Sequence, residues 1–167
     1  LDNRVVFPIR DYDGNLVSIK GRTLKKDFVE RGIPKYLYYY NIIGALFLFN
    51  YYEHYFDILD SEYLIVCESE KSCMQLHSMG IYNTVATSKK RISEEQAQEI
   101  NDLGKKIVLA YDNDVTMGEI KMELSKLNGE VYYIKDTFGL LGKKDSPSDK
   151  GYEVWNKLYQ NKFKLER

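Results

Sequence analysis

Three acidic residues stand directly behind two apolar runs of the chain. Asp112 and Asp114 follow VLAY, and Glu68 follows YLIVC. In an extended backbone, residues two apart point to the same side, so the two aspartates would lie roughly 6 to 7 Å apart. Carboxylates this crowded repel one another, and a hard cation such as Mg²⁺ relieves the repulsion. The pattern predicts a divalent metal site. Taken singly, each acid could also be solvated or cap the next helix.

Strands and helices alternate around these acids. Apolar runs predict strands at 63–68, 83–87, 105–111 and 130–135, and helical spacing predicts helices at 69–80, 93–104, 117–127 and 151–160. This alternation is typical of an α/β fold with a parallel sheet of about four strands flanked by helices. The carboxyl ends of parallel strands are where such folds bind ligands, so the three acids are expected to meet at that edge.

The first part of the chain has a different pattern. RVVFPIR and LVSIKGR are short β-rich runs joined by DYDGN, and this Asp-Gly turn chemistry predicts a small N-terminal β-hairpin subdomain. The aromatic-rich stretch ALFLFNYYEHYF is apolar at nearly every position, which leaves helix and strand both open, with helix slightly favoured. We therefore predict two units, residues 1–60 and 61–167.

The composition and net charge of the chain exclude few functional classes. The 167 residues carry 24 basic and 25 acidic side chains, a net charge of −1, so binding to nucleic acid would need a local basic patch or bound cations. Cys67 and Cys73 have no zinc-ligand spacing and are predicted to be free thiols in the cytoplasm. No apolar run is long enough to cross a bilayer, so no membrane partner is expected. The start of the chain, close to a strand, suggests a piece of a longer polypeptide.

At the acidic residues the chain resembles the Toprim family, in which a strand is followed by Glu-Gly and a later strand by Asp-x-Asp. IVCESEK supplies Glu68, with Ser69 where the family has glycine, and LAYDNDV supplies Asp112 and Asp114. The preceding VVFPIRDYDGNLVSIKGRTL and the PKYL at 34–37 resemble segments that DnaG-type bacterial primases carry ahead of their Toprim domain. The chain is therefore identified as a divergent primase fragment, with an origin in a phage or mobile element expected.

That resemblance implies template-directed synthesis of RNA primers on single-stranded DNA from ribonucleoside triphosphates, with a replicative helicase as a further candidate partner. It implies that Glu68, Asp112 and Asp114 hold Mg²⁺ or Mn²⁺ and are the catalytic residues. KKDSPSD resembles the acidic stretch after the fourth Toprim strand, so Asp145 and Asp149 become candidate outer metal ligands. Candidate phosphate-binding residues are Arg10, Lys20, Arg22, Lys35 and Lys71. The parent protein is expected to be the active form, since part of the template-holding lobe is not in this fragment.

Two other functional classes stay open. VLAYDNDVT also resembles the haloacid dehalogenase-like phosphatase signature, in which Asp112 would be the nucleophile and Asp114 the acid/base. That motif normally stands early in its fold, whereas two strand-helix units precede it here. The second alternative is a non-catalytic nucleic-acid-binding module on a Toprim scaffold, for which metal binding would be weak.

Overall fold

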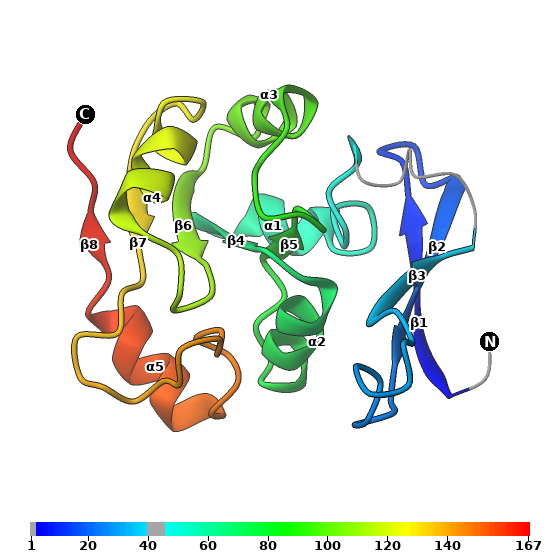
Figure 1. Cartoon of the computed structure of the whole chain (residues 1–167). Coiled ribbons are helices and arrows are strands. Elements are labelled where there is room, and N and C mark those ends of the chain that lie inside the picture. Colours follow the sequence, from blue (N-terminus) through cyan, green and yellow to red (C-terminus); the bar gives the residue numbers. More distant parts are fainter. Residues whose placement is uncertain (1–2, 40–45) are drawn as a thin grey trace.

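The computed structural model describes residues 3–39 and 46–167 and contains two β-sheets (Figure 1). The first is a three-stranded antiparallel sheet in the order β1-β2-β3, and the second is five-stranded in the order β5-β4-β6-β7-β8. The strands are β1 (Arg4–Arg10), β2 (Leu16–Thr23), β3 (Tyr36–Tyr38), β4 (Tyr63–Cys67), β5 (Thr84–Ala86), β6 (Lys106–Ala110), β7 (Val131–Tyr133) and β8 (Phe163–Lys164). The helices are α1 (Tyr55–Asp60), α2 (Glu70–Ser78), α3 (Glu94–Asp102), α4 (Met117–Leu124) and α5 (Tyr152–Gln160).

The predicted α/β fold is confirmed. Strands β5, β4, β6 and β7 run parallel, and only β8 is antiparallel, at the edge beside β7. Helices α3 and α4 cover one face of the sheet, and α2 and α5 cover the other (Figure 1). The N-terminal antiparallel hairpin is confirmed as well, and β3 extends it to three strands. Within the described residues, no helix has the length and apolar character that a membrane crossing requires.

The core follows from the two-residue alternation of the central strands. In β4, Leu64 and Val66 pack with α3 and α4, whereas Ile65 and Cys67 pack with α2 and α5. Because both faces are covered, the strand is apolar at every position, which explains why the sequence showed an unbroken apolar run. The sheet is therefore fixed in register, and the residues that follow its strands are fixed with it.

Local sequence signals explain where the helices begin. The side chain of Ser93 accepts a hydrogen bond from the backbone N–H of Gln96, and the side chain of Gln96 accepts one from the N–H of Ser93. This reciprocal capping box fixes the start of α3. Thr116 and Glu119 form a second capping box at α4, directly after the Asp112–Asp114 pair. The loop with Asp112 and Asp114 is thus held by β6 on one side and by the capped start of α4 on the other.

The aromatic-rich segment differs from the expected helix. Residues 40–45 lie outside the described part, and of the rest of the stretch only its last two residues, Tyr55 and Phe56, belong to an α-helix, α1. Phe49 instead forms an antiparallel bridge with Ala86 of β5, and its buried ring packs edge-on against that of Phe7, so tertiary contacts override the local preference. Leu48 and Ile58 are in the core beneath α3 and α4. The predicted boundary at residues 60 and 61 stays a prediction.

Candidate metal and phosphate site

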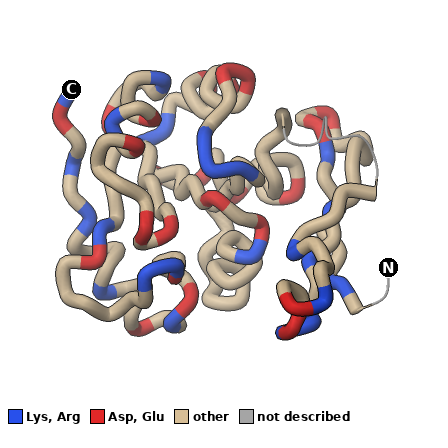
Figure 2. The backbone as a smooth tube through the Cα atoms, in the orientation of Figure 1, with Lys and Arg blue, Asp and Glu red and all other residues tan. Residues whose placement is uncertain are grey.

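The acids meet at the carboxyl ends of two neighbouring parallel strands. β4 ends at Cys67 and β6 ends at Ala110, and these two residues are paired in register. Glu68 therefore stands beside the Asp112 loop, and its carboxylate accepts a hydrogen bond of 3.0 Å from the backbone N–H of Asp112. Figure 2 shows acidic segments directly after both strands, with the basic loop between β5 and α3 beside them.

Burial and neighbouring negative charges raise the pKa values of Glu68 and Asp112. The pKa of Glu68 is raised to about 7, mainly because burial disfavours its charged form, and the negative charges of Asp112 and Asp114 raise it further. Burial likewise raises the pKa of Asp112, with Asp149 and Asp114 adding to the effect and Lys71 opposing it. Asp114 itself is exposed. A positive ion between these carboxylates would stabilise their charged forms.

The donor set suits a cation that shares its coordination with a substrate. Among the described residues, no group of three or more His, Cys, Asp or Glu side chains that could hold a metal ion is found. Mg²⁺ does not need such a cage, since it is usually held by one or two carboxylates together with water and phosphate oxygens. Glu68 and Asp112 supply such a pair of half-buried carboxylates. Their roles as metal ligands stay predictions.

A cleft of about 250 Å³ opens over Glu68 and Asp112 and is lined mainly by cations. The basic residues in its lining are Lys20, Arg22, Lys35, Lys71, Lys89, Lys90 and Lys144. Burial lowers the pKa of Lys35, and the neighbouring charges of Arg22 and Lys71 lower it further, which indicates how closely the positive charges are gathered. An array of cations around two carboxylates is suited to a polyanion that brings its own metal ion, such as a triphosphate.

Lys71 and Asp149 contact each other. The ammonium of Lys71 is hydrogen-bonded to the Asp149 carboxylate, which also accepts hydrogen bonds from Gln75 at 2.9 Å and from the backbone N–H of Ser146 at 2.8 Å. Although burial raises it, the pKa of Asp149 is held below its ordinary value by these hydrogen bonds. The pair ties α2 to the loop ahead of α5. Lys71 therefore stays a candidate phosphate-binding residue and Asp149 a candidate outer metal ligand, and in this structure each is paired with the other.

The remaining predicted residues are more dispersed. Asp145 is bound by Lys150 at 2.9 Å and by the backbone N–H of Gly142 at 2.8 Å. Its backbone oxygen accepts a hydrogen bond from the N–H of Asn113, so its loop lies beside the Asp112 loop. Arg10 contacts Glu53 at 3.3 Å and is not among the residues that line the cleft.

Lys20 has a different environment from the one expected of a phosphate-binding cation. Its side chain is buried, and its ammonium contacts both carboxylate oxygens of Glu70, at 2.8 and 3.0 Å. Glu70 had not been singled out, although it stands two residues after Glu68 at the start of a helix. Tyr36, Ser88 and Lys144 also line the cleft without having been predicted. Tyr36 and Lys144 directly follow basic residues in the sequence, and Ser88 gave no signal.

Comparisons with known proteins place this geometry in a family. The Toprim domain family matches residues 63–138, a range that includes Glu68, Asp112 and Asp114. The chain contains a Toprim domain. It is 31% identical over 114 residues to a DNA primase of Clostridium acetobutylicum, an alignment that covers 67% of this chain and 18% of the relative. It is also 31% identical over 116 residues to the DNA primase of Aquifex aeolicus, covering 66% of this chain and 22% of that protein.

Solved structures agree with the Toprim assignment. The zinc-binding and RNA polymerase domains of the Aquifex aeolicus primase superpose with a TM-score of 0.79 at 26% identity, covering 98% of this chain and 41% of that one. A DnaG primase catalytic domain bound to single-stranded DNA superposes with a TM-score of 0.73 at 21% identity, covering 96% and 53%. The chain thus has DnaG-type primase homologues and spans about a fifth of the curated relatives' length. Its origin in a phage or mobile element stays a prediction.

The raised pKa values of the Toprim acids predict a pH dependence of stability. Native Glu68, with a pKa of about 7, holds its proton at pH values where the unfolded chain has lost it. Glu68 therefore binds more protons in the native than in the unfolded state between about pH 4.5 and about pH 7, so its contribution to the free energy of unfolding falls as pH rises through this window. Burial lowers the pKa of His77 to about 4, and that group contributes the opposite slope. Glu68→Gln should therefore make the free energy of unfolding fall less, or rise more, with pH than it does in the wild type. Urea unfolding in a chelator across this range measures it, and an identical pH profile for both proteins would contradict the expectation.

Proposed function

We propose that the protein carrying this chain is a cytoplasmic primase that synthesises RNA primers on single-stranded DNA with Mg²⁺ or Mn²⁺. The observation that carries the proposal is the hydrogen-bonded Glu68–Asp112 pair at the carboxyl ends of β4 and β6, inside a cation-lined cleft. The homology to DNA primases supports it. Because the Toprim match includes both Glu68 and the Asp pair, we favour it over a phosphatase reaction at Asp112.

The residues of the cleft would act mainly by placing charges. Glu68, Asp112 and Asp114 would hold the divalent ions, which on binding would polarise the nucleotide phosphates and the primer hydroxyl. Arg22, Lys35 and the neighbouring lysines would neutralise the triphosphate, leaving it in line for displacement. Asp145 and Asp149 would be outer metal ligands, held in place by their contacts with Lys150 and Lys71.

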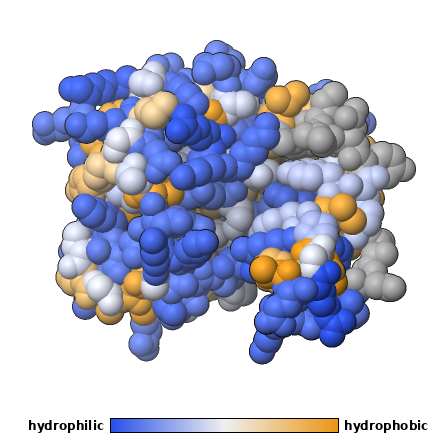
Figure 3. Space-filling model, viewed as in Figure 1, coloured by the Kyte–Doolittle hydropathy of each residue, from blue (hydrophilic) through white to orange (hydrophobic). Residues whose placement is uncertain are grey.

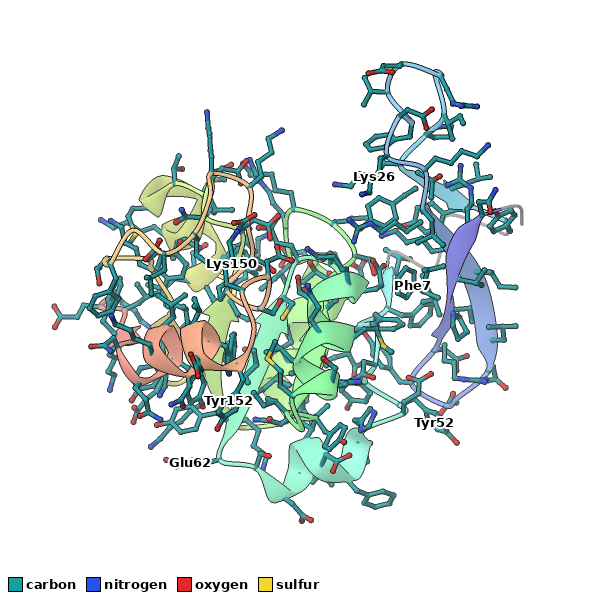
Figure 4. The ribbon with its side chains drawn as sticks, turned by 90° about the horizontal axis from the view of Figure 1, so that it is seen from below. Phe7, Lys26, Tyr52, Glu62, Lys150 and Tyr152 are labelled. Atoms are coloured by element: carbon teal, nitrogen blue, oxygen red, sulfur yellow. The ribbon has the colours of Figure 1, made fainter. Side chains whose placement is uncertain are left out.

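A second, larger groove offers a path for the template strand. It has a volume of about 810 Å³ and lies between the N-terminal sheet and α2, sharing Arg22, Lys35 and Lys71 with the cleft. Figure 3 shows the notch between the N-terminal part and the body of the molecule, with apolar atoms beside it. In Figure 4, Phe7 points from β1 toward the body, and Lys26 lies on the loop after β2; both line the groove. Apolar and cationic surfaces together suit a single strand with exposed bases.

The primary test is primer synthesis by the full-length protein. We expect it to make short RNA on a single-stranded DNA template from ribonucleoside triphosphates when Mg²⁺ or Mn²⁺ is added. Labelled products resolved on a denaturing gel, with and without ribonuclease, measure this directly. Templated products that form equally well in a chelator would contradict the metal-dependent part of the proposal. Inorganic phosphate released from an aryl phosphate, with no primers formed, would favour the phosphatase alternative instead.

Arg22 gives a second prediction, since it lines both the cleft and the groove. Replacing Arg22 by Ala should weaken binding of single-stranded DNA and lower the slope of log affinity against log salt by about one, as expected for the loss of one phosphate contact. Fluorescence anisotropy with a labelled oligonucleotide over a salt series measures both quantities. Lys164→Ala, an exposed change on the edge strand β8, is the control. An unchanged salt slope for Arg22→Ala would remove this residue from the proposed interface.

A further inference from the structure

An ion pair inside the molecule joins the N-terminal sheet to the Toprim sheet. Lys20 comes from β2, and its ammonium lies 2.8 and 3.0 Å from the two carboxylate oxygens of Glu70, the first residue of α2. The side chain of Lys20 is 5% exposed and that of Glu70 is 0% exposed. Every other ion pair among the described residues has at least one partially exposed partner, so this pair alone is removed from solvent on both sides.

The same ammonium contacts a third segment. Lys20 donates a hydrogen bond of 3.3 Å to the backbone oxygen of Ser88, in the turn after β5. The rings of Tyr36 and Tyr38 stand over it, with their centres 4.5 and 5.4 Å from the nitrogen. β2, the start of α2 and the turn after β5 therefore meet at one buried charge, which two aromatic rings flank.

Each of these segments supplies a wall of the cleft. β2 continues to Arg22, α2 begins two residues after Glu68, and the turn after β5 leads to Lys89 and Lys90. The carboxylates of the cleft are held by the Toprim sheet, whereas Arg22 and Lys35 belong to the N-terminal sheet and the segment before β3. The distance between these two sets of charges is thus set by how the two sheets are joined.

Stability alone is a poor explanation for such a pair. Removing two charges from water costs about as much as their attraction returns, and a buried apolar pair of similar size often serves the fold equally well. What an ion pair with two short contacts does provide is a fixed geometry, because an ammonium held by two carboxylate oxygens and one carbonyl has little freedom to shift.

We propose that Lys20 and Glu70 are positioning residues that set the spacing between the carboxylates of the cleft and the cations of the N-terminal sheet, so that one nucleoside triphosphate with its metal ion spans both. The inference rests on the proposed function. It assigns Lys20 an indirect role, since its ammonium is bound to Glu70 and is not available to a phosphate. Arg22 and Lys35 remain the direct phosphate ligands.

The test separates spacing from folding with the double variant Lys20→Met/Glu70→Met in the full-length protein. We expect thermal stability close to that of the wild type, unchanged Mn²⁺ affinity without nucleotide, and a KM for ribonucleoside triphosphates raised about tenfold or more, because small displacements at a reaction centre have large effects. Glu70→Asp, which keeps the charge and shortens the side chain, should raise KM by a smaller factor. Lys20→Arg should also raise KM, because a longer, planar guanidinium does not reproduce the contacts of the buried ammonium.

The outcomes are distinct. A double variant that is stable and has the wild-type KM would overturn the positioning role. If the double variant does not fold, the test passes to Glu70→Asp, and a folded Glu70→Asp variant with unchanged KM would overturn the role in the same way. Direct binding of a fluorescent nucleoside triphosphate is measured alongside turnover. If the wild-type protein makes no primers, the proposed primase function fails. If the affinity for the fluorescent nucleotide is nevertheless lower in the variants than in the wild type, the positioning role of Lys20 and Glu70 stands even though the primase function does not.

Discussion

Replacing Asp112 by Asn in the full-length protein should lower the rate of primer synthesis by roughly a thousandfold or more, because bound metal ions supply several kcal/mol of transition-state stabilisation. The same change should leave the fold intact. Within the described residues, the Asp112 carboxylate makes no hydrogen bond, and its charge is disfavoured by burial and by Asp149 and Asp114. Removing that charge relieves repulsion, so the variant should be as stable as the wild type or more so.

The measurement combines primer synthesis with urea unfolding on the same protein preparations. Asp60→Asn is the matched control, because it removes one carboxylate from the exposed end of α1 and should change neither quantity. Loss of activity together with a loss of stability would mean that Asp112 is structural. Retained activity would remove the central ligand from the proposed mechanism and favour a non-catalytic Toprim module.

The second large effect is expected at the buried ion pair. Lys20→Met leaves the carboxylate of Glu70 buried without its partner, and breaking a buried pair from one side typically costs about 3 to 5 kcal/mol of unfolding free energy. Glu70 has no exposed surface through which water could replace the lost contact. The double variant Lys20→Met/Glu70→Met should recover most of the loss, since it removes the unpaired charge as well.

A surface pair provides the comparison. Lys164 and Glu130 lie 3.3 Å apart with side chains 55% and 41% exposed, so Lys164→Met should cost less than about 1 kcal/mol. Urea unfolding of the wild type and these three variants gives all the free energies needed. Equal losses at Lys20 and Lys164 would show that burial of the Lys20–Glu70 pair has no energetic consequence, and failure of the double variant to recover would point to lost packing rather than an unpaired charge.

The sequence determined the α/β architecture because its signals are local. The apolar runs of β4 and β6 reflect strands covered on both faces, and Ser93 with Gln96 marks the start of α3 within four residues. The spacing of Cys67 and Cys73 also predicted free thiols, and the structure has both free and, in addition, buried. Placing Glu68 beside Asp112 required only the rule that parallel strands end at one edge, and the hydrogen bond between them agrees with it.

Only the tertiary structure decided which cations have partners. Lys20 meets Glu70 across 50 positions and Lys71 meets Asp149 across 78, and neither contact leaves a periodic signal in the sequence. The same limit applies to Phe49, whose bridge to Ala86 overrides any helical tendency of its aromatic neighbours. A pattern of spacing reports the face on which a side chain lies, whereas its burial and its ionic partner depend on which distant segment packs against that face.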